Sequence, residues 1–246
     1  MRYIEYGKEN RDVILLLHGG GLSWWNYKEV AELLQEDYRV ILPILDGHAE
    51  SDKSFTTIED NAADIIQFID EHFGGYVLMI GGLSLGGQIL LEMLTQRNDI
   101  CKYAIIESAL VIPSKITYSM IESVFGSCHG LISKKWFSKL QFKSLKIRPD
   151  LFEFYYRDTC AISKSDMIAI LKANSRYSLK ESVKGCKAKA YICVGGKESN
   201  IMKKSARIIS QAMSGELQII PSLYHGEFSI NRCNDYVDKI RKSIAD

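Results

Sequence analysis

The sequence predicts an α/β fold built on a mostly parallel, doubly wound sheet with a helical insertion. Apolar runs of strand length alternate with helical patterns in the first and last parts of the chain, which is typical of parallel sheets covered by helices on both faces. Residues 113–183 instead contain helical patterns and no convincing strand. We therefore expect a core formed by residues 1–112 and 184–246, with residues 113–183 inserted as a helical cap.

The composition limits the classes of protein to which the chain can belong. Its 246 residues are 46% hydrophobic and 25% charged, which is enough apolar sequence for a large buried core. The formal net charge of +1 supplies no overall field that would attract nucleic acid or an anionic membrane surface. We therefore expect a small-molecule partner, without nucleic acid or membrane. The sequence leaves open whether the protein is a monomer or a homodimer.

The six cysteines are scattered, with no C-x-x-C spacing and no His/Cys cluster. A zinc site is therefore not expected, and we expect no other cofactor. Free thiols suit a reducing compartment. The first residues lack the long apolar core of a signal peptide, and no apolar stretch approaches the length of a membrane span. These features together predict a cytoplasmic location.

The elements of the first half of the core follow from hydrophobic periodicity. After a short opening strand, residues 12–17 form a continuous apolar run, which is typical of a strand buried on both faces. A helix over residues 24–36 and a strand over residues 38–43 are expected next. The Thr57-x-x-Asp60 pattern then starts a helix that we expect to end at residue 73.

The second half of the core repeats this alternation. Each expected strand is a short apolar run bounded by turn residues, and each expected helix carries apolar residues at helical spacing. The strands are expected at residues 76–80, 102–106, 188–194 and 216–220, and the helices at residues 88–94, 200–213 and 234–244.

The inserted segment is expected to form a lid of four helices, at residues 116–125, 134–142, 149–160 and 165–173. Such a lid is best placed over the sheet edge that carries the predicted site. Its many aromatic residues either line an apolar pocket or attach the lid to the core. A basic run from Lys134 to Arg148 is more typical of a solvated helix face than of a site for an anionic substrate.

The segment around Ser84 is the centre of the predicted site. A strand-like run ends in Gly82-Leu83-Ser84-Leu85-Gly86, and a helical pattern follows. This order fits the G-x-S-x-G nucleophile elbow, in which a serine sits on a strained turn between a strand and a helix. The glycines leave room for so sharp a turn. Ser84 is therefore the predicted nucleophile, and the amide of Leu85 faces any negative charge that forms beside it.

A second glycine-rich segment, His18-Gly19-Gly20-Gly21, follows the strand expected at residues 12–17. Ligands of open α/β sheets bind at the carboxyl ends of the strands, and an HGGG-type loop supplies the second half of an oxyanion hole. We expect the amide of Gly20 to be the donor, with that of Gly21 as the second choice. His18 is expected to brace this loop through a hydrogen bond.

A serine nucleophile needs a general base, and the base needs an acid that fixes its tautomer. Behind an elbow of this kind the chain order is serine, acid, histidine. His225, in the loop after the last strand, is the predicted base in preference to His129 in the inserted segment. Glu198, in the turn after the strand at residues 188–194, is the predicted acid. Glu107 is the alternative acid, and would otherwise be a loop carboxylate facing water.

With these motifs in chain order, the sequence resembles the α/β-hydrolase superfamily over essentially its whole length. The matching segments are His18–Gly20, Gly82–Gly86, Gly196–Glu198 and Tyr224–Gly226. The resemblance implies attack by Ser84, general-base assistance by His225 oriented by Glu198, and oxyanion stabilisation by the amides of Leu85 and Gly20.

Two positions depart from the pattern of that superfamily. The acid is glutamate where aspartate is commoner, which lengthens the side chain by one methylene without changing its role. The segment Asp46-Gly47-His48-Ala49 is similar to the G-H-G turn of the superfamily but has alanine at the second glycine. Because His48 lies in what reads as a tight reversal, we expect no catalytic role for it.

The resemblance does not fix a substrate, because one fold hosts many reactions. The predicted function is hydrolysis of a small carboxylic ester through an acyl-enzyme, in a capped pocket that admits short to medium acyl chains or an aromatic acid. The alternatives within enzymes are C–C bond hydrolases, proline-releasing aminopeptidases, and acyltransferases or lyases. A small-ligand receptor on the same scaffold is the alternative from another class.

Overall fold

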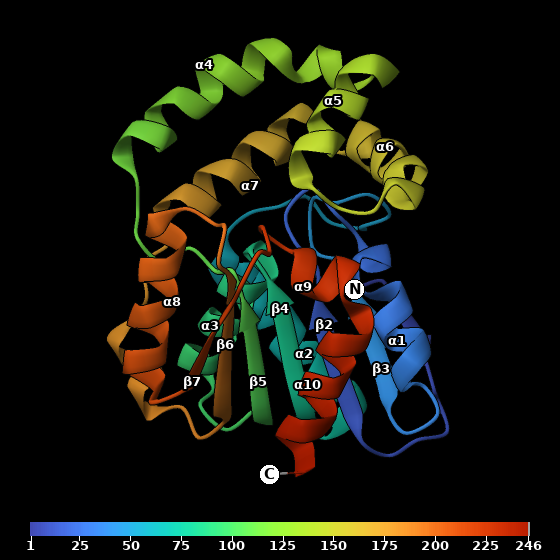
Figure 1. Cartoon of the computed structure of the whole chain (residues 1–246), viewed down its shortest axis with the longest axis vertical. Helices are drawn as coiled ribbons and strands as arrows, with labels where there is room; N and C mark the ends of the chain where they lie inside the picture. Colours follow the sequence, from blue (N-terminus) through green and yellow to red (C-terminus); the bar gives the residue numbers. More distant parts are fainter. Residues whose placement is uncertain (246) are drawn as a thin grey trace.

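The computed structural model describes residues 1–245, except for the side chain of Cys128, and contains a single mixed sheet in the order β1-β3-β2-β4-β5-β6-β7 (Figure 1). β1 pairs antiparallel with β3, and the other neighbouring strands are parallel. The predicted α/β class with a mostly parallel sheet is therefore confirmed. The strands are β1 Tyr3–Tyr6, β2 Val13–Leu17, β3 Arg39–Pro43, β4 Val77–Leu83, β5 Cys101–Glu107, β6 Lys189–Gly195 and β7 Glu216–Ile220.

Helices cover both faces of the sheet, as expected for a doubly wound topology. Apolar residues of α1 (Lys28–Leu34) and α10 (Cys233–Ala245) are buried in one hydrophobic cluster with one face of the sheet. Residues of α2 (Ile58–Phe73), α3 (Leu85–Gln96) and α8 (Asn200–Met213) are buried in a second cluster with the opposite face (Figure 1).

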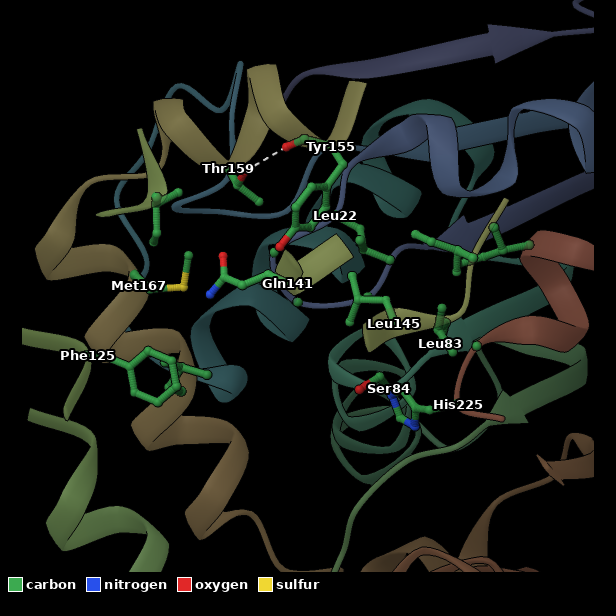
Figure 2. Close-up of a pocket in the computed structure, with 18 residues that line it drawn as sticks. Leu22, Leu83, Ser84, Phe125, Gln141, Leu145, Tyr155, Thr159, Met167 and His225 are labelled. Carbon is green, nitrogen blue, oxygen red and sulfur yellow. Dashed lines mark hydrogen bonds between the residues drawn. The ribbon is translucent and has the colours of Figure 1, made fainter. Parts of the chain in front are cut away.

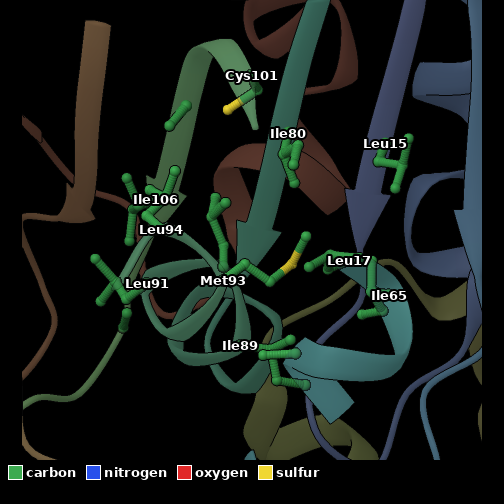
Figure 3. Close-up of a cluster of buried hydrophobic side chains, with 14 of the residues drawn as sticks. Leu15, Leu17, Ile65, Ile80, Ile89, Leu91, Met93, Leu94, Cys101 and Ile106 are labelled. Atoms are coloured by element: carbon green, nitrogen blue, oxygen red, sulfur yellow. The ribbon is translucent and has the colours of Figure 1, made fainter. Parts of the chain in front are cut away.

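The central strand β2 shows why its sequence is continuously apolar. Ile14 and Leu16 are buried on the side of α1 and α10, whereas Leu15 and Leu17 are buried on the side of α3 (Figure 3). Successive side chains of a strand point to opposite faces of the sheet. With both faces covered, neither set can be polar, and the alternation found in half-exposed strands is absent.

Four helices between β5 and β6 lie above the carboxyl end of the sheet (Figure 1). We call them the cap helices: α4 Lys115–Ile132, α5 Lys135–Leu145, α6 Phe152–Ala161 and α7 Lys164–Arg176, with a short 3₁₀ turn at Pro149–Leu151. A second 3₁₀ turn, Glu181–Gly185, follows them before β6. α4 is longer than the periodicity predicted.

Hydrogen bonds between side chains attach the cap helices to the core. The Trp25 indole donates to Asp158 of α6 over 2.8 Å, with both side chains buried. The Asn174 amide of α7 donates to the Gln88 side chain of α3 over 3.0 Å. These contacts join the two parts where the chain is far apart in sequence, so periodicity alone could not predict them.

Two local features differ from the sequence-based expectation. The helix expected over residues 24–36 begins as a 3₁₀ turn, Trp24–Tyr27, before α1. Within that turn the Asn26 side chain accepts the amide of Gly19 over 3.1 Å, so the segment is shaped by a tertiary contact. The loop after β7 contains a short helix, α9 Glu227–Asn231, which is too brief to produce a periodic signal.

The elbow glycines are required by close backbone contact. A Cβ atom on Gly86 would lie 2.1 Å from the carbonyl oxygen of Leu17, and one on Gly82 would lie 2.4 Å from that of Gly86. Real Cβ atoms do not approach backbone oxygens so closely, and a carbonyl in the central strand has little freedom to move. Glycine therefore sets how tightly α3 approaches β2 and β4.

We predict that Gly86→Ala lowers the free energy of unfolding by at least about 2 kcal/mol, because the new methyl group overpacks this contact. Gly130→Ala is the matched control. Gly130 lies in α4 with no atom within 4 Å of an added Cβ, so the helix propensity of alanine should leave stability unchanged or raise it by up to about 1 kcal/mol. Urea unfolding of both variants measures the difference, and equal midpoints would contradict the packing argument.

Candidate active site

Ser84 is the single residue between β4 and α3. Its backbone angles, φ 54 and ψ −110, lie in a region that non-glycine residues rarely adopt. The Ser84 amide donates to the carbonyl of Glu107 over 2.8 Å, and its carbonyl accepts the amide of Gln88 over 3.0 Å. These bonds hold the turn in its strained form, and Ser84 lines a cavity beneath the cap helices.

His225 and Glu198 form a hydrogen-bonded pair beside this serine. The Nδ1 atom of His225 lies 2.8 Å from Oε2 of Glu198, and Figure 2 shows the imidazole next to Ser84. A carboxylate can only accept, so this contact assigns the proton to Nδ1. The Nε2 atom is then left with a lone pair that can receive the proton of a serine hydroxyl.

The structure fixes the Glu198 side chain through its second oxygen. Oε1 accepts the Ser108 hydroxyl over 2.6 Å and the Gly195 amide over 2.7 Å. Burial raises the pKa of Glu198, but the hydrogen bonds from His225, Ser108 and Gly195 outweigh it and lower the pKa overall. Glu198 is therefore a carboxylate at neutral pH. No local pattern in the sequence indicates a role for Ser108, although its position directly after β5 places it at the same edge of the sheet.

The loops that carry this pair are also bound to each other. The amides of Gly196 and Lys197 donate to the carbonyls of Ile220 and Leu223, over 2.7 and 3.0 Å. The segment between β6 and α8 is therefore bound to the segment that leads to His225.

Glu107, the alternative acid, occupies a different position. Its side chain is only 2% exposed, so the expectation that it would otherwise face water was wrong. The Ser229 amide lies 3.4 Å from Oε1, and Oε2 has no hydrogen-bond partner within residues 1–245. Burial raises the pKa of Glu107 to about 7. The described residues show no hydrogen bond between Glu107 and His225.

The two residues whose amides are expected to bind an oxyanion are neighbours in space. A Cβ atom on Gly20 would be 3.5 Å from the Cβ of Leu85. In the described part of the chain, neither the Gly20 amide nor the Leu85 amide has a hydrogen-bond acceptor. The Gly21 amide, our second choice, already donates to Nε2 of His48 over 3.1 Å. The unpaired amides are thus those of the two residues that the sequence favoured.

Two buried histidines hold the glycine loop, His18–Gly21, in place. His18 accepts the Leu45 amide at Nε2 over 3.2 Å, and its ring lies 4.8 Å from that of His48, measured between centroids. Both imidazoles contact a backbone carbonyl through Nδ1, that of Gly19 for His18 and that of Asp46 for His48. Burial lowers the pKa of His18 well below its ordinary value and that of His48 to about 4. Both are therefore neutral braces of the loop.

His129, the less favoured base, makes a contact within the cap helices. One of its ring nitrogens lies 3.2 Å from the carbonyl of Ile162, and it is absent from the lining of the cavity. The structure thus separates His129 from Ser84.

The cavity beside Ser84 has a volume of about 280 Å³ and is lined by residues of the core loops and the cap helices (Figure 2). Most of the lining is aliphatic or aromatic, including Leu22, Leu83, Phe125 and Leu145. A pocket of this kind suits a small, mainly apolar ligand. Of the cap aromatics, Phe125 and Tyr155 contribute to the lining.

Among the side chains that the structure describes, which exclude that of Cys128, no group of three or more His, Cys, Asp or Glu able to hold a metal ion occurs. Over the described residues, no helix combines the length and apolar character needed to cross a lipid bilayer.

Comparisons with known proteins bear on the fold. The family model described as alpha/beta hydrolase fold matches residues 12–125. The chain is similar to the uncharacterized hydrolase YugF of Bacillus subtilis (strain 168), with 28% identity over 142 residues. That match spans 56% of this chain and only 51% of the relative.

Solved structures match over nearly the whole chain. A thermophilic esterase from Thermogutta terrifontis has a TM-score of 0.79 at 18% identity, covering 98% of this chain and 91% of the other. The enol-lactonase from Burkholderia xenovorans LB400 has a TM-score of 0.83 at 16% identity, covering 100% and 96%. The chain therefore has the α/β-hydrolase fold.

We predict that acid weakens the folded state through the two buried histidines. The pKa of His48 is about 4 in the folded protein against an ordinary 6.5, so the unfolded chain binds the extra proton first. The free energy of unfolding should then fall as the pH is lowered from about 6.5 towards 4, by up to about 1.4 kcal/mol per pH unit for each such histidine.

Urea unfolding at a series of pH values measures this slope. In His48→Gln the amide oxygen can still accept the Gly21 amide, but nothing titrates, so the slope should become shallower. His72→Gln, in α2 and away from the loop, is the control and should keep the wild-type slope. Identical slopes in all three proteins would rule out His48 as a source of the acid sensitivity.

Proposed function

We propose that the protein is a serine hydrolase that cleaves small carboxylic esters through an acyl-enzyme intermediate. The observation that carries this proposal is the 2.8 Å contact between Nδ1 of His225 and Glu198, with the imidazole beside the strained Ser84 in one cavity (Figure 2). An activated serine, a neutral base and two unpaired amides are the groups that acyl transfer requires.

In the proposed first step, His225 accepts the Ser84 proton at Nε2 as the serine oxygen attacks the ester carbonyl. Glu198 stabilises the resulting imidazolium, since it is ionised and bound to Nδ1. The amides of Gly20 and Leu85 donate to the oxyanion of the tetrahedral intermediate. His225 then protonates the leaving alcohol, and the acyl group remains on Ser84.

In the second half of the reaction, water replaces the alcohol. His225 removes a proton from that water, which attacks the acyl carbonyl, and the imidazolium returns the proton to Ser84 as the acid leaves. The similar proteins support this chemistry, because they include a hydrolase, an esterase and an enol-lactonase. A lactone is a cyclic ester and is opened by the same attack.

We predict that p-nitrophenyl acetate and butyrate are hydrolysed and that Ser84→Ala lowers kcat/KM at least about 1,000-fold. The mutation removes the nucleophile but leaves the fold, which circular dichroism can check. A fluorophosphonate probe should label the wild type at Ser84 and leave the mutant unlabelled. Wild-type turnover by the mutant would disprove the nucleophile. A folded wild type that takes up no label would instead favour a ligand-binding receptor.

The two carboxylates can be separated by a matched pair of variants. Glu198→Gln should lower kcat at least about 100-fold, because an amide can donate to Nδ1 and so favour the wrong tautomer of His225. Glu107→Gln should retain most of the activity, because that carboxyl makes no hydrogen bond to His225 in the described residues. If Glu107→Gln were the more damaging change, the acid would be misassigned.

A further inference from the structure

Beyond the ester-cleaving groups, the cavity contains two polar side chains with no hydrogen-bond partner. The eighteen residues that line it include no Asp, Glu, Lys or Arg. Apart from Ser84 and His225, the polar side chains in the lining are Gln141, Tyr155 and Thr159, all from the cap helices. They therefore lie on the part of the cavity that faces the catalytic loops.

Tyr155 of α6 is held rigidly and offers a hydroxyl to the cavity. Its side chain is only 7% exposed, and its ring packs against Phe142 of α5 with 5.2 Å between centroids. Within the described residues the Tyr155 hydroxyl makes no hydrogen bond. Burial raises its pKa to about 12, so the group stays protonated and can donate. The hydroxyl is not among the fully buried unpaired atoms of the described residues, so it is accessible from the cavity, and an occupant could accept a hydrogen bond from it.

Gln141 of α5 is the neighbour of Phe142 in the chain and is half-buried. In residues 1–245 its side-chain amide forms no hydrogen bond, and its backbone carbonyl accepts the Ser144 hydroxyl. Figure 2 shows the Gln141 amide and the Tyr155 ring projecting into the same cavity from different helices. Thr159, by contrast, already donates to the Tyr155 carbonyl over 2.6 Å.

We infer that Gln141 and Tyr155 form a subsite for an uncharged oxygen acceptor carried by the substrate, such as a ketone, hydroxyl or ether group separate from the ester that is cleaved. This inference rests on the proposed function. Both side chains can donate to such an oxygen, through the Gln141 amide and the Tyr155 hydroxyl. The rest of the cap-side lining is mainly apolar, so the connecting part of the substrate is hydrocarbon.

The cavity lining contains no Lys or Arg, so the oxygen group that binds at the subsite should be uncharged. A carboxylate or phosphate placed there would lose its water without gaining a Lys or Arg partner, which disfavours the ionised form. The lysines of α5 that the sequence raised as a possible anion site, Lys135, Lys139 and Lys143, are exposed and do not line the cavity. The subsite therefore selects neutral oxygenated esters over charged ones.

Matched substrates test this selectivity. One series varies the acyl side with p-nitrophenyl hexanoate, 5-oxohexanoate and hydrogen adipate, and another varies the alcohol side with hexyl and 5-oxohexyl acetate. In at least one series we expect kcat/KM to be about tenfold higher for the oxo ester than for the plain ester, which is the hexanoate or hexyl acetate without the ketone. A difference of this size corresponds to one or two neutral hydrogen bonds. The carboxylate-bearing ester should be the poorest substrate of its series.

Tyr155→Phe and Gln141→Leu should each reduce the preference at least about threefold by raising KM for the oxo ester. The plain ester makes no such bond, so its KM should rise less than that of the oxo ester in both variants. Tyr156→Phe is the control on the same helix, because the Tyr156 hydroxyl donates to the Ser133 carbonyl over 2.7 Å and does not line the cavity. A merely structural role would lower kcat for plain and oxo esters alike.

Binding to Ser84→Ala separates this inference from the proposed function, because it needs no turnover. The Kd of the oxo ester should be lower than that of the plain ester, and Ser84→Ala/Tyr155→Phe should lose the difference. Tighter binding without any wild-type turnover or serine labelling would count against ester hydrolysis and in favour of the subsite. Any one of three results would overturn the subsite. The first is equal Kd and equal kcat/KM values for the oxo and plain esters in every pair. The others are a preference for the oxo ester that neither variant reduces, and a preference for the carboxylate-bearing ester.

Discussion

The close approach of α3 to the central strands is the constraint on which the rest of the site depends. Gly86 leaves no room for a Cβ atom against the Leu17 carbonyl, and Gly82 leaves none against the Gly86 carbonyl. The chain can therefore pass from strand to helix through one residue, which is forced to a positive φ. This strain is sustained because β4 lies between β2 and β5 in the buried centre of the sheet, and because Ser84 bonds to Glu107 and Gln88. The position of the proposed nucleophile is a consequence of glycine packing several residues away from it.

Sheet order then brings the remaining groups together. β5, β6 and β7 are adjacent and parallel, so the residues that follow them meet at one edge. Ser108 follows β5, Glu198 follows β6 and His225 follows β7, and these three side chains form a continuous chain of hydrogen bonds. On the other side of Ser84, β2 is the neighbour of β4, and the loop after β2 brings the Gly20 amide to the same edge of the sheet. Separation along the sequence has little bearing on the assembly, because the strand termini determine which side chains meet.

Much of this arrangement could be predicted from the sequence, and the remainder has a physical explanation. Continuous apolar runs identify strands buried on both faces, and the glycines around Ser84 identify the elbow, because both signals are local. The sequence could not reveal that Glu107 is buried, that Ser108 fixes Glu198, or that His48 accepts the Gly21 amide, since each depends on a contact between distant segments. The 3₁₀ turn before α1 could not be predicted for the same reason, because the Asn26 side chain accepts the amide of Gly19.

The two parts of the chain contribute different properties to the cavity. The proposed reacting groups come from loops at the ends of β2, β4, β6 and β7, where the backbone is held by the sheet and by the loops bound to it. The polar groups that would distinguish one substrate from another come from α5 and α6, which contact the core through side chains such as Asp158 on Trp25. Sequence changes in the cap helices could therefore alter selectivity without disturbing the strained turn or the His225–Glu198 pair. The fold is shared at 16–18% identity with an esterase and an enol-lactonase, so most of the sequence can differ while this architecture is kept.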